Sequence, residues 1–279
     1  GVMYVAAKSS TLPILQQAAA ELGLTFTGVA VAPSGNALKL RPVRIGLADR
    51  PGGSVPSGWT RWMLERYEFP FEVLSGQRLN ADDLSAKYDV LILPDDTMNR
   101  QGGHRAADVP TVARLRRFVE EGGTLLAIGA ATSVGIEFGL PIENPLVDGT
   151  RRPLPPEQYY VPGSVLRVTV DNTISPAYGF ERVVDVFFDN SPVFRLEPGA
   201  SARGIRPVAW FGTSAPLRSG WIRGQGHLQH TVAIVDAPLG KGRVLLCGPQ
   251  ITFRAQSHGT FKFLFNGIYY GNAIPTHLQ

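Results

Sequence analysis

The stretch that decides the fold is GGTLLAIGAATSVG, residues 122–135. It predicts a buried strand over Thr124–Ile128, a sharp turn of small residues, and then a helix. Several α/β hydrolase and transferase folds hold their nucleophile at such a strand–turn–helix junction. In this chain Ala131 stands where a thiol or a hydroxyl is expected. The stretch therefore indicates a domain that has the fold of an enzyme but lacks the nucleophile.

Two hydroxyls follow this alanine, Thr132 and Ser133. A hydroxyl at a displaced position needs an adjacent base before it can act as a nucleophile. The alternative interpretation is that both residues cap the helix that follows, which is an ordinary use of Ser and Thr.

The elements around the stretch alternate between strand and helix. Near-continuous apolar strands of this kind are typical of a mostly parallel sheet that is covered on both faces. We therefore predict an α/β fold with a flavodoxin-like sheet and helices on both faces, and we expect ligands near the loops after Ala48, Leu93 and Ile128. The strands are predicted over Val43–Ala48, Phe71–Leu74, Tyr88–Pro94 and Thr124–Ile128, and the helices over Gly58–Tyr67, Thr111–Glu121 and Thr260–Tyr270.

The residue pattern divides the chain into an N-terminal segment and a main domain. Residues 1–40 predict a connector or a small βαβ-like N-terminal module, with strands over Met3–Ala6 and Leu24–Val31 around a helix over Thr11–Leu22. Residues 41–275 form the main domain, in which residues 141–230 are a β-rich insertion. Strands are expected there over Val165–Val170, Val183–Phe188, Val193–Leu196 and Pro207–Phe211, followed by an antiparallel pair, Thr231–Val235 with Val244–Cys247, joined by the loop 236–242.

Composition excludes several classes of function. The formal net charge of the 279 residues is +4, and the basic residues are scattered among acids, so no nucleic-acid-binding patch is expected. No apolar run is long enough to span a membrane, and the first residues do not resemble a signal peptide. The single cysteine, Cys247, lies in an apolar run and is expected to be a core residue rather than a nucleophile.

Two loops carry candidate ligand-binding residues. The segment Gly52–Trp62 offers Ser54, Ser57, Trp59 and Arg61 for an anion or a sugar hydroxyl, although it lacks the spacing of a phosphate-binding loop. The alternative is that Ser57 or Gly58 caps a helix while Trp59 or Trp62 packs in the core. The segment Phe253–Gly259 offers Arg254, Gln256 and His258 near a helix N-terminus, where anions bind readily, or these groups serve only local roles.

Histidines give no metal site by pattern. His227 and His230 have an i, i+3 spacing, but no carboxylate or thiol accompanies them, and a zinc site needs three or four convergent ligands. We expect no metal and no cofactor. The five histidines are His104, His227, His230, His258 and His277.

Four segments together resemble a known family: RPVRIGL (41–47), GGSVPSGWTRW (52–62), FPFEV (69–73) and GPQITFRAQSHGTFK (248–262). They are similar to the class I glutamine amidotransferase-like domain at the C-terminus of bacterial zinc carboxypeptidase (carboxypeptidase A-like) proteins. The resemblance covers the chain from about residue 40 onward.

The resemblance implies the fold without the activity. Working amidotransferases hold Cys at the turn and His-Pro-Glu after the last strand, and these match Ala131, Gly248, Pro249 and Gln250, so that only the proline agrees. The zinc motif His-x-x-Glu of the peptidase occurs nowhere in the chain, which implies that a peptidase active site would lie upstream. The resemblance also suggests a secreted or periplasmic location.

Three functions follow as hypotheses. The first is a non-catalytic accessory domain of a larger zinc carboxypeptidase-like hydrolase, with an attached or upstream peptidase domain as its partner. The second is a glycan- or peptide-binding module that uses Trp59, Arg61, Arg254 and His258. The third is a hydrolase with a relocated site at Ser133 and His258. The sequence leaves the oligomeric state open.

Overall fold

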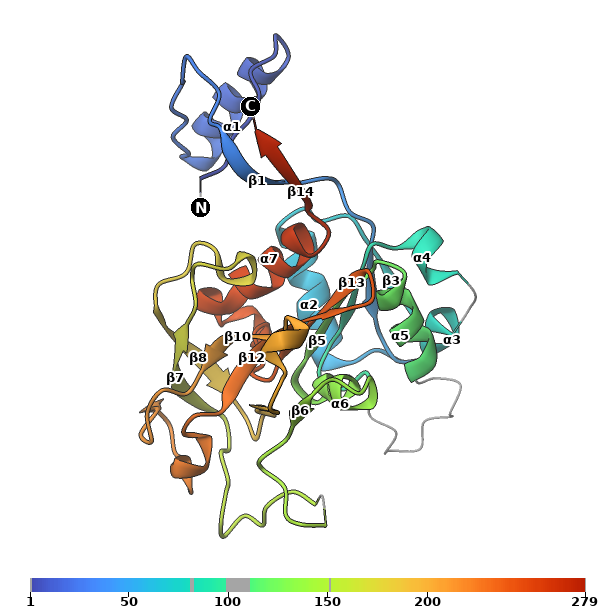
Figure 1. The fold of residues 1–279 in the computed structure, drawn as a ribbon, viewed down its shortest axis with the longest axis vertical. Coiled ribbons are helices and arrows are strands. Elements are labelled where there is room, and N and C mark those ends of the chain that lie inside the picture. Colours follow the sequence, from blue (N-terminus) through green and yellow to red (C-terminus); the bar gives the residue numbers. More distant parts are fainter. Residues whose placement is uncertain (1, 81–82, 99–110, 151, 279) are drawn as a thin grey trace. The chain divides into compact units, whose positions relative to one another are not determined.

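The computed structural model describes residues 2–80, 83–98, 111–150 and 152–278. The chain divides into two compact units, one of residues 41–272 and one of residues 1–40 with 273–279 (Figure 1). Each unit is described by itself below.

A parallel sheet forms the centre of the larger unit. Its five described strands run parallel to one another. Three of them are buried along their whole length: β2 (Ile45–Ala48), β4 (Val90–Leu93) and β5 (Thr124–Ile128). Uninterrupted apolar strands form because both faces of the sheet are covered. The order is β3 (Phe71–Leu74), β2 (Ile45–Ala48), β4 (Val90–Leu93), β5 (Thr124–Ile128) and β13 (Gly242–Cys247).

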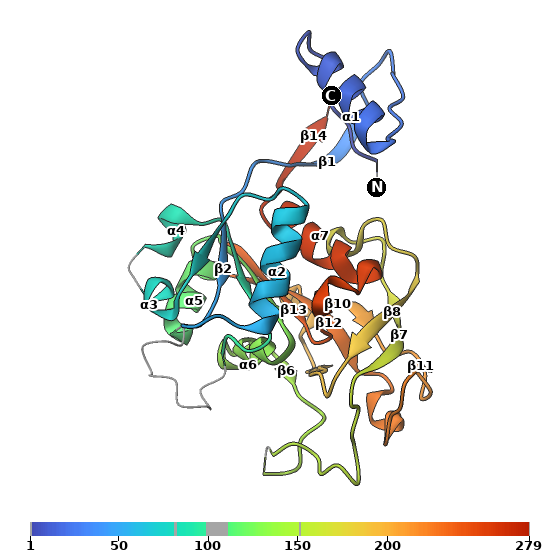
Figure 2. The ribbon, with the colours of Figure 1, turned by 180° about the vertical axis from the view of Figure 1, so that it is seen from behind.

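Helices cover both faces of this sheet, as predicted (Figures 1 and 2). On one face α2 (Val55–Arg66) and α7 (Phe261–Gly271) pack on residues such as Leu126, and on the other α5 (Val112–Glu120) packs on residues such as Leu125. Successive side chains of a strand point to opposite faces, so one strand serves both cores. Shorter helices are α3 (Gly76–Leu79), α4 (Leu84–Lys87) and α6 (Val134–Glu137). No helix in the described part of the chain combines the length and apolar character needed to cross a bilayer.

Antiparallel strands extend the same sheet beyond β13. The strands predicted over Val165–Val170, Val183–Phe188 and Pro207–Phe211 are present, whereas only Arg195–Leu196 of the predicted strand Val193–Leu196 is a strand, and it lies outside this sheet. Strand β12 continues to Leu239, so the turn to β13 holds only Gly240 and Lys241 rather than the longer predicted loop. Pro238 fits in β12 because the neighbouring strand β10 pairs with β12 only up to Asp236. The strands are β12 (Val232–Leu239), β10 (Arg206–Trp210), β7 (Ser164–Val170), β11 (Leu217–Ser219) and β8 (Val183–Phe188).

Minor elements complete the larger unit. The strands β6 (Ile142–Glu143) and β9 (Arg195–Leu196) form a separate antiparallel pair. The 3-10 helices are η2 (Gly129–Ser133), η3 (Ser175–Ala177), η4 (Ser201–Arg203), η5 (Gln225–Leu228), η6 (Phe253–Ala255) and η7 (His258–Thr260).

The smaller unit differs from the predicted βαβ-like lead-in. Its helix α1 (Thr11–Leu22) is confirmed, but neither residues 3–6 nor residues 24–31 form a strand. Instead β1 (Gly35–Lys39) pairs antiparallel with β14 (Ile274–Leu278), near the other end of the sequence. A strand exists only where a partner satisfies its backbone groups, and local alternation does not reveal whether a partner is present.

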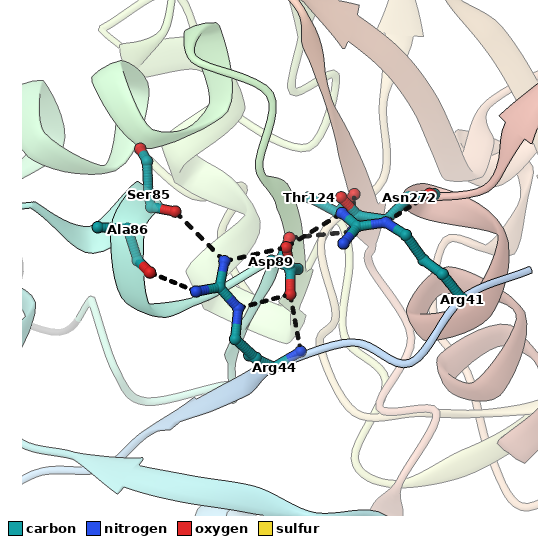
Figure 3. A network of polar contacts seen from close by, with 7 residues as sticks. All are labelled: Arg41, Arg44, Ser85, Ala86, Asp89, Thr124 and Asn272. Atoms are coloured by element: carbon teal, nitrogen blue, oxygen red, sulfur yellow. Dashed lines mark hydrogen bonds and ion pairs between the residues drawn. The ribbon is translucent and has the colours of Figure 1, made fainter.

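Asp89 organises a polar network where the chain enters and leaves the larger unit (Figure 3). Its carboxylate accepts hydrogen bonds from Arg41 Nη2 at 3.0 Å and from Arg44 Nε and the Arg44 backbone N–H, both at 2.9 Å. Asn272 Nδ2 donates to the Asp89 carbonyl and to Thr124 Oγ1, each at 2.9 Å. The two ends of the unit are thus joined through Asp89, whose carboxylate binds Arg41 and whose backbone carbonyl binds Asn272.

Candidate functional site

A small pocket of about 50 Å³ lies at the carboxyl ends of the parallel strands. Open α/β sheets bind their ligands at this edge. The loops after β4 and β13 and the start of α2 supply its walls. Its lining includes Trp59, Asp95, Ile128, Gln250, Phe253 and Arg254.

Asp95 is the central polar group of this strand-end pocket. Its half-buried carboxylate accepts hydrogen bonds from the backbone N–H of Ala130 at 2.5 Å and from Gln250 Nε2 at 2.8 Å. Burial raises the pKa of Asp95, the Ala130 N–H opposes that rise, and the negative charges of Asp96 and Asp189 add to it. Among the described residues no cation pairs with this carboxylate.

The turn after β5 presents its apex at Gly129. This residue has a φ of +59°, and a Cβ added to it would lie 2.0 Å from Asp95 Oδ1. Ala131, the position matched to the missing cysteine, is fully buried and packs in the core on the α5 side. A side chain at position 129 would therefore collide with Asp95, so the turn needs a glycine there.

The hydroxyls near the turn have local roles. Thr132 Oγ1 donates to the Gly129 carbonyl at 2.7 Å, and Ser133 is exposed without making a capping bond to α6. The interpretation that both cap the helix is therefore wrong, because the turn is already wound as the 3-10 helix η2 before α6 begins.

Of the residues matched to the missing His and Glu, one reaches the pocket. A Cβ on Gly248 would lie 2.0 Å from the carbonyl oxygen of Pro192, so this position is closed to any side chain. Gln250 lines the pocket and holds Asp95. An amide at this position donates to the carboxylate without supplying a base.

Of the four candidate residues in the first predicted ligand-binding loop, only Trp59 lines the pocket, beside Val55 and Pro56 of the same loop. Helix α2 begins at Val55, because Ser54 rather than Ser57 or Gly58 accepts its capping bond, from the Ser57 N–H at 3.2 Å. Ser57 is buried, and its Oγ donates to the Ala48 carbonyl at 3.3 Å. Arg61 pairs with Glu65 at 2.9 Å and does not line the pocket.

The tryptophans of α2 do not pack in the core as the alternative interpretation expects. Trp59 and Trp62 are 37% and 46% exposed and meet edge to face at 6.3 Å. Thr60 and Met63, which are buried, take the inward positions. Trp59 lines the pocket, where its partly exposed indole can contact a ligand.

The second predicted loop divides between two cavities. Arg254 lines the strand-end pocket, with its guanidinium 5.2 Å from the Phe253 ring and its backbone at a φ of +46°. Gln256 and His258 instead line a separate groove of about 710 Å³ beside β8. Ser133 lines neither cavity, so the structure does not bring Ser133 and His258 into a common site.

Thiol and metal chemistry find no support at the pocket. Cys247 is buried in β13, and burial raises the pKa of its thiol. Within the described ranges no three His, Cys, Asp or Glu residues converge as metal ligands. His104 lies outside the described residues, and His277, in the smaller unit, contacts Asn36 Oδ1 at 3.2 Å.

Comparison with known proteins gives the fold. No protein-family model matches the chain, and no curated protein matches it. It is similar to the structure of a putative GMP synthase subunit from Thermoplasma acidophilum, with a TM-score of 0.50 and 10% identity over 82% of this chain and 93% of that one.

Two further structures are similar at lower scores. A glutamine amidotransferase from Thermotoga maritima has a TM-score of 0.47 and 12% identity over 81% of this chain and 83% of that one. A beta-galactosidase from Bacillus circulans sp. alkalophilus has a TM-score of 0.46 and 13% identity over 80% of this chain but 31% of that one. The likeness to the Thermoplasma structure, at a TM-score of 0.50, supports a class I glutamine amidotransferase-like fold, an α/β fold with a mixed, mainly parallel central sheet. Identities this low carry no activity across.

Proposed function

We propose that the chain is a non-catalytic, amidotransferase-like accessory domain of a larger zinc carboxypeptidase-like hydrolase, which it supports or for which it binds substrate. One observation supports the absence of catalysis: Ala131, at the position matched to the cysteine, is buried in the core, and the carboxylate of Asp95 lies against the turn instead. Covalent acyl transfer requires a nucleophile activated by a neighbouring base. The described pocket offers a carboxylate, an amide, a guanidinium and an indole instead.

The attachment to a peptidase rests on the sequence resemblance of residues 41–73 and 248–262. It is tested on the complete gene product. A metallopeptidase domain upstream of these residues, with zinc-dependent release of C-terminal amino acids, supports the proposal. A complete product that contains no hydrolase domain contradicts it.

Incubation of the chain with L-glutamine is expected to release ammonia at the rate of a protein-free blank. A thiol-reactive glutamine analogue should leave native Cys247 unlabelled, because a buried thiol with a raised pKa holds little thiolate. Labelling should become stoichiometric in 8 M urea, which serves as the positive control. Ammonia release that Cys247→Ala abolishes would show that the domain is a working amidotransferase.

A second function, the binding of a glycan or a peptide, is favoured by the strand-end pocket itself. Asp95 and Arg254 carry opposite charges, and neither has an ion-pair partner among the described residues. Arg254 also stays in the left-handed backbone region, which costs about 1 kcal/mol or more for a residue with a Cβ. Unpaired charges, backbone strain and an exposed indole on one small pocket favour ligand binding over a purely structural role.

Binding is measured by calorimetry against cell-wall fragments and short peptides. Trp59→Ala and Arg254→Ala are each expected to weaken a saturable ligand by about tenfold, which equals about 1.4 kcal/mol. Arg61→Ala is the matched control, since Arg61 is on the same helix but faces away from the pocket. Equal affinities for all three variants would place the ligand elsewhere.

A further inference from the structure

We propose that the free edge of β8 is a strand-addition site, at which an extended peptide pairs with the sheet through its backbone. The proposal uses the groove of about 710 Å³ beside β8 and does not depend on the strand-end pocket.

Strand β8 is at the outer edge of the sheet. Its only sheet partner among the described strands is β7. Thr169 of β7 pairs with Val183 of β8 and also with Trp210 of β10, so β8 and β10 lie on opposite sides of β7. The second side of β8 is therefore open to another strand.

The alternating hydrogen-bond pattern between β7 and β8 shows which backbone groups of β8 point to the open side. The N–H of Val170 donates to the Arg182 carbonyl at 2.9 Å, and hydrogen-bonded positions alternate along an antiparallel pair. Val183, Asp185 and Phe187 therefore direct their N–H and C=O groups away from β7. No backbone hydrogen bond to another described segment satisfies these groups.

The groove follows this edge. It is lined by every residue from 183 to 187 and, across from them, by Phe253, Gln256, His258 and Lys262. Consecutive strand residues point to opposite faces of a sheet, so a cavity that touches all of them reaches the edge of the strand, and it extends from there to Val165 of β7. Its volume is within the range of protein ligand sites.

An extended peptide is the occupant that complements these features. Its own N–H and C=O groups match the unpaired row on β8, which is how strand addition gains affinity. The stacked rings of Phe187 and Phe253, 3.6 Å apart, offer an apolar surface for one side chain. Glu181 lines the groove without an ion-pair partner among the described residues, which favours a basic residue in the peptide.

The charges on the strand protect the edge without closing it. Asp185 pairs with Arg167 at 2.9 Å, and Arg218 lies within 3.8 Å of it. Charged side chains on edge strands discourage uncontrolled pairing between copies of a chain. The backbone of β8 stays available to a peptide that avoids like charge at this position.

The probe is a capped heptapeptide of alternating valine and threonine with a lysine at each end. In amide hydrogen exchange on the full chain, the N–H groups of Val183, Asp185 and Phe187 should exchange fast without peptide and at least tenfold more slowly with it. A peptide N-methylated at alternate residues, which lacks half of the donors, should bind at least tenfold more weakly. Protection of these amides without peptide, equal binding of the two peptides, or no binding at millimolar concentration would each overturn the proposal.

A pair of variants at one position separates backbone pairing from charge. Asp185→Pro removes one outward N–H and places the ring in the groove, while the ladder to β7 keeps its bonds. It should abolish peptide protection of Val183 and Phe187, whereas Asp185→Asn should retain it. Loss of the peptide-induced protection in both variants would show that binding depends on the Asp185 carboxylate and would contradict strand addition. The melting temperature of each variant reports whether it is folded.

Discussion

Asp89→Ala is expected to lower the free energy of unfolding by about 3 kcal/mol, a large part of the stability of an ordinary domain. The carboxylate is 9% exposed and accepts hydrogen bonds from two arginines and a backbone N–H. Its loss leaves the Arg44 N–H unpaired and separates Arg41 from the strands it holds. The arginines are about half exposed, so water replaces part of what they lose.

Urea unfolding measures this change. Asp185→Asn is the control, because it breaks the ion pair of Asp185 with Arg167, in which both side chains are about 40% exposed. Exposed pairs contribute little, so the control should change the free energy of unfolding far less than Asp89→Ala does. Equal losses in the two variants would mean that burial adds nothing to the Asp89 network.

The Asp89 contribution should also depend on pH. Burial by itself would raise the pKa of Asp89, but the hydrogen bonds from Arg44 and Arg41 outweigh it and lower the pKa to about 2. The pKa in the folded chain is thus below the ordinary value of 3.8, so the stabilisation is complete above that value and is lost as pH falls toward 2. Roughly 2 kcal/mol of the difference between wild type and Asp89→Asn should disappear between pH 6 and pH 2. A difference that stays constant over this range would contradict the ionic origin.

The sequence predicts the central sheet because its elements are determined locally. Apolar runs such as Val90–Leu93 and Thr124–Ile128 can be buried only between two layers of helices. The spacing of Leu115 and Val119 marks the buried face of α5 in the same way. Each signal lies within a few residues, so a parallel α/β fold follows from the order of the segments.

Long-range pairing is not predictable from such signals. Residues 24–31 alternate as a strand would, yet they form no strand, whereas residues 35–39, for which no strand was predicted, pair with residues 274–278. The difference lies in a partner more than two hundred residues away in the sequence, which no local pattern encodes.

In the candidate site, too, the local features are predictable from the sequence and the long-range contacts are not. The loops that follow the strands are correctly located by sequence, and Trp59, Gln250 and Arg254 meet in one pocket. Asp95 has no distinguishing pattern, since an aspartate after a strand is common in loops. Only the fold brings its carboxylate to Gln250 and to the turn after β5.

The contact between Asp95 and the turn gives the second large expected effect. Gly129→Ala should cost about 3 kcal/mol, because its Cβ meets Asp95 Oδ1 at 2.0 Å and its φ is unfavourable for a residue with a side chain. Gly139→Ala isolates the backbone term, since Gly139 has a φ of +69° and open space around its Cβ position. That control should cost about 1 kcal/mol.

A double-mutant cycle tests whether the rest of the Gly129→Ala cost, beyond the backbone contribution, comes from the contact with the Asp95 carboxylate. In an Asp95→Ala background the cost of Gly129→Ala should fall to about 1 kcal/mol, which gives a coupling energy of about 2 kcal/mol. Urea unfolding of the four proteins measures it. A cost unaffected by Asp95→Ala would mean that the carboxylate does not restrict position 129. The predicted coupling instead means that the carboxylate of Asp95 disfavours any side chain at position 129.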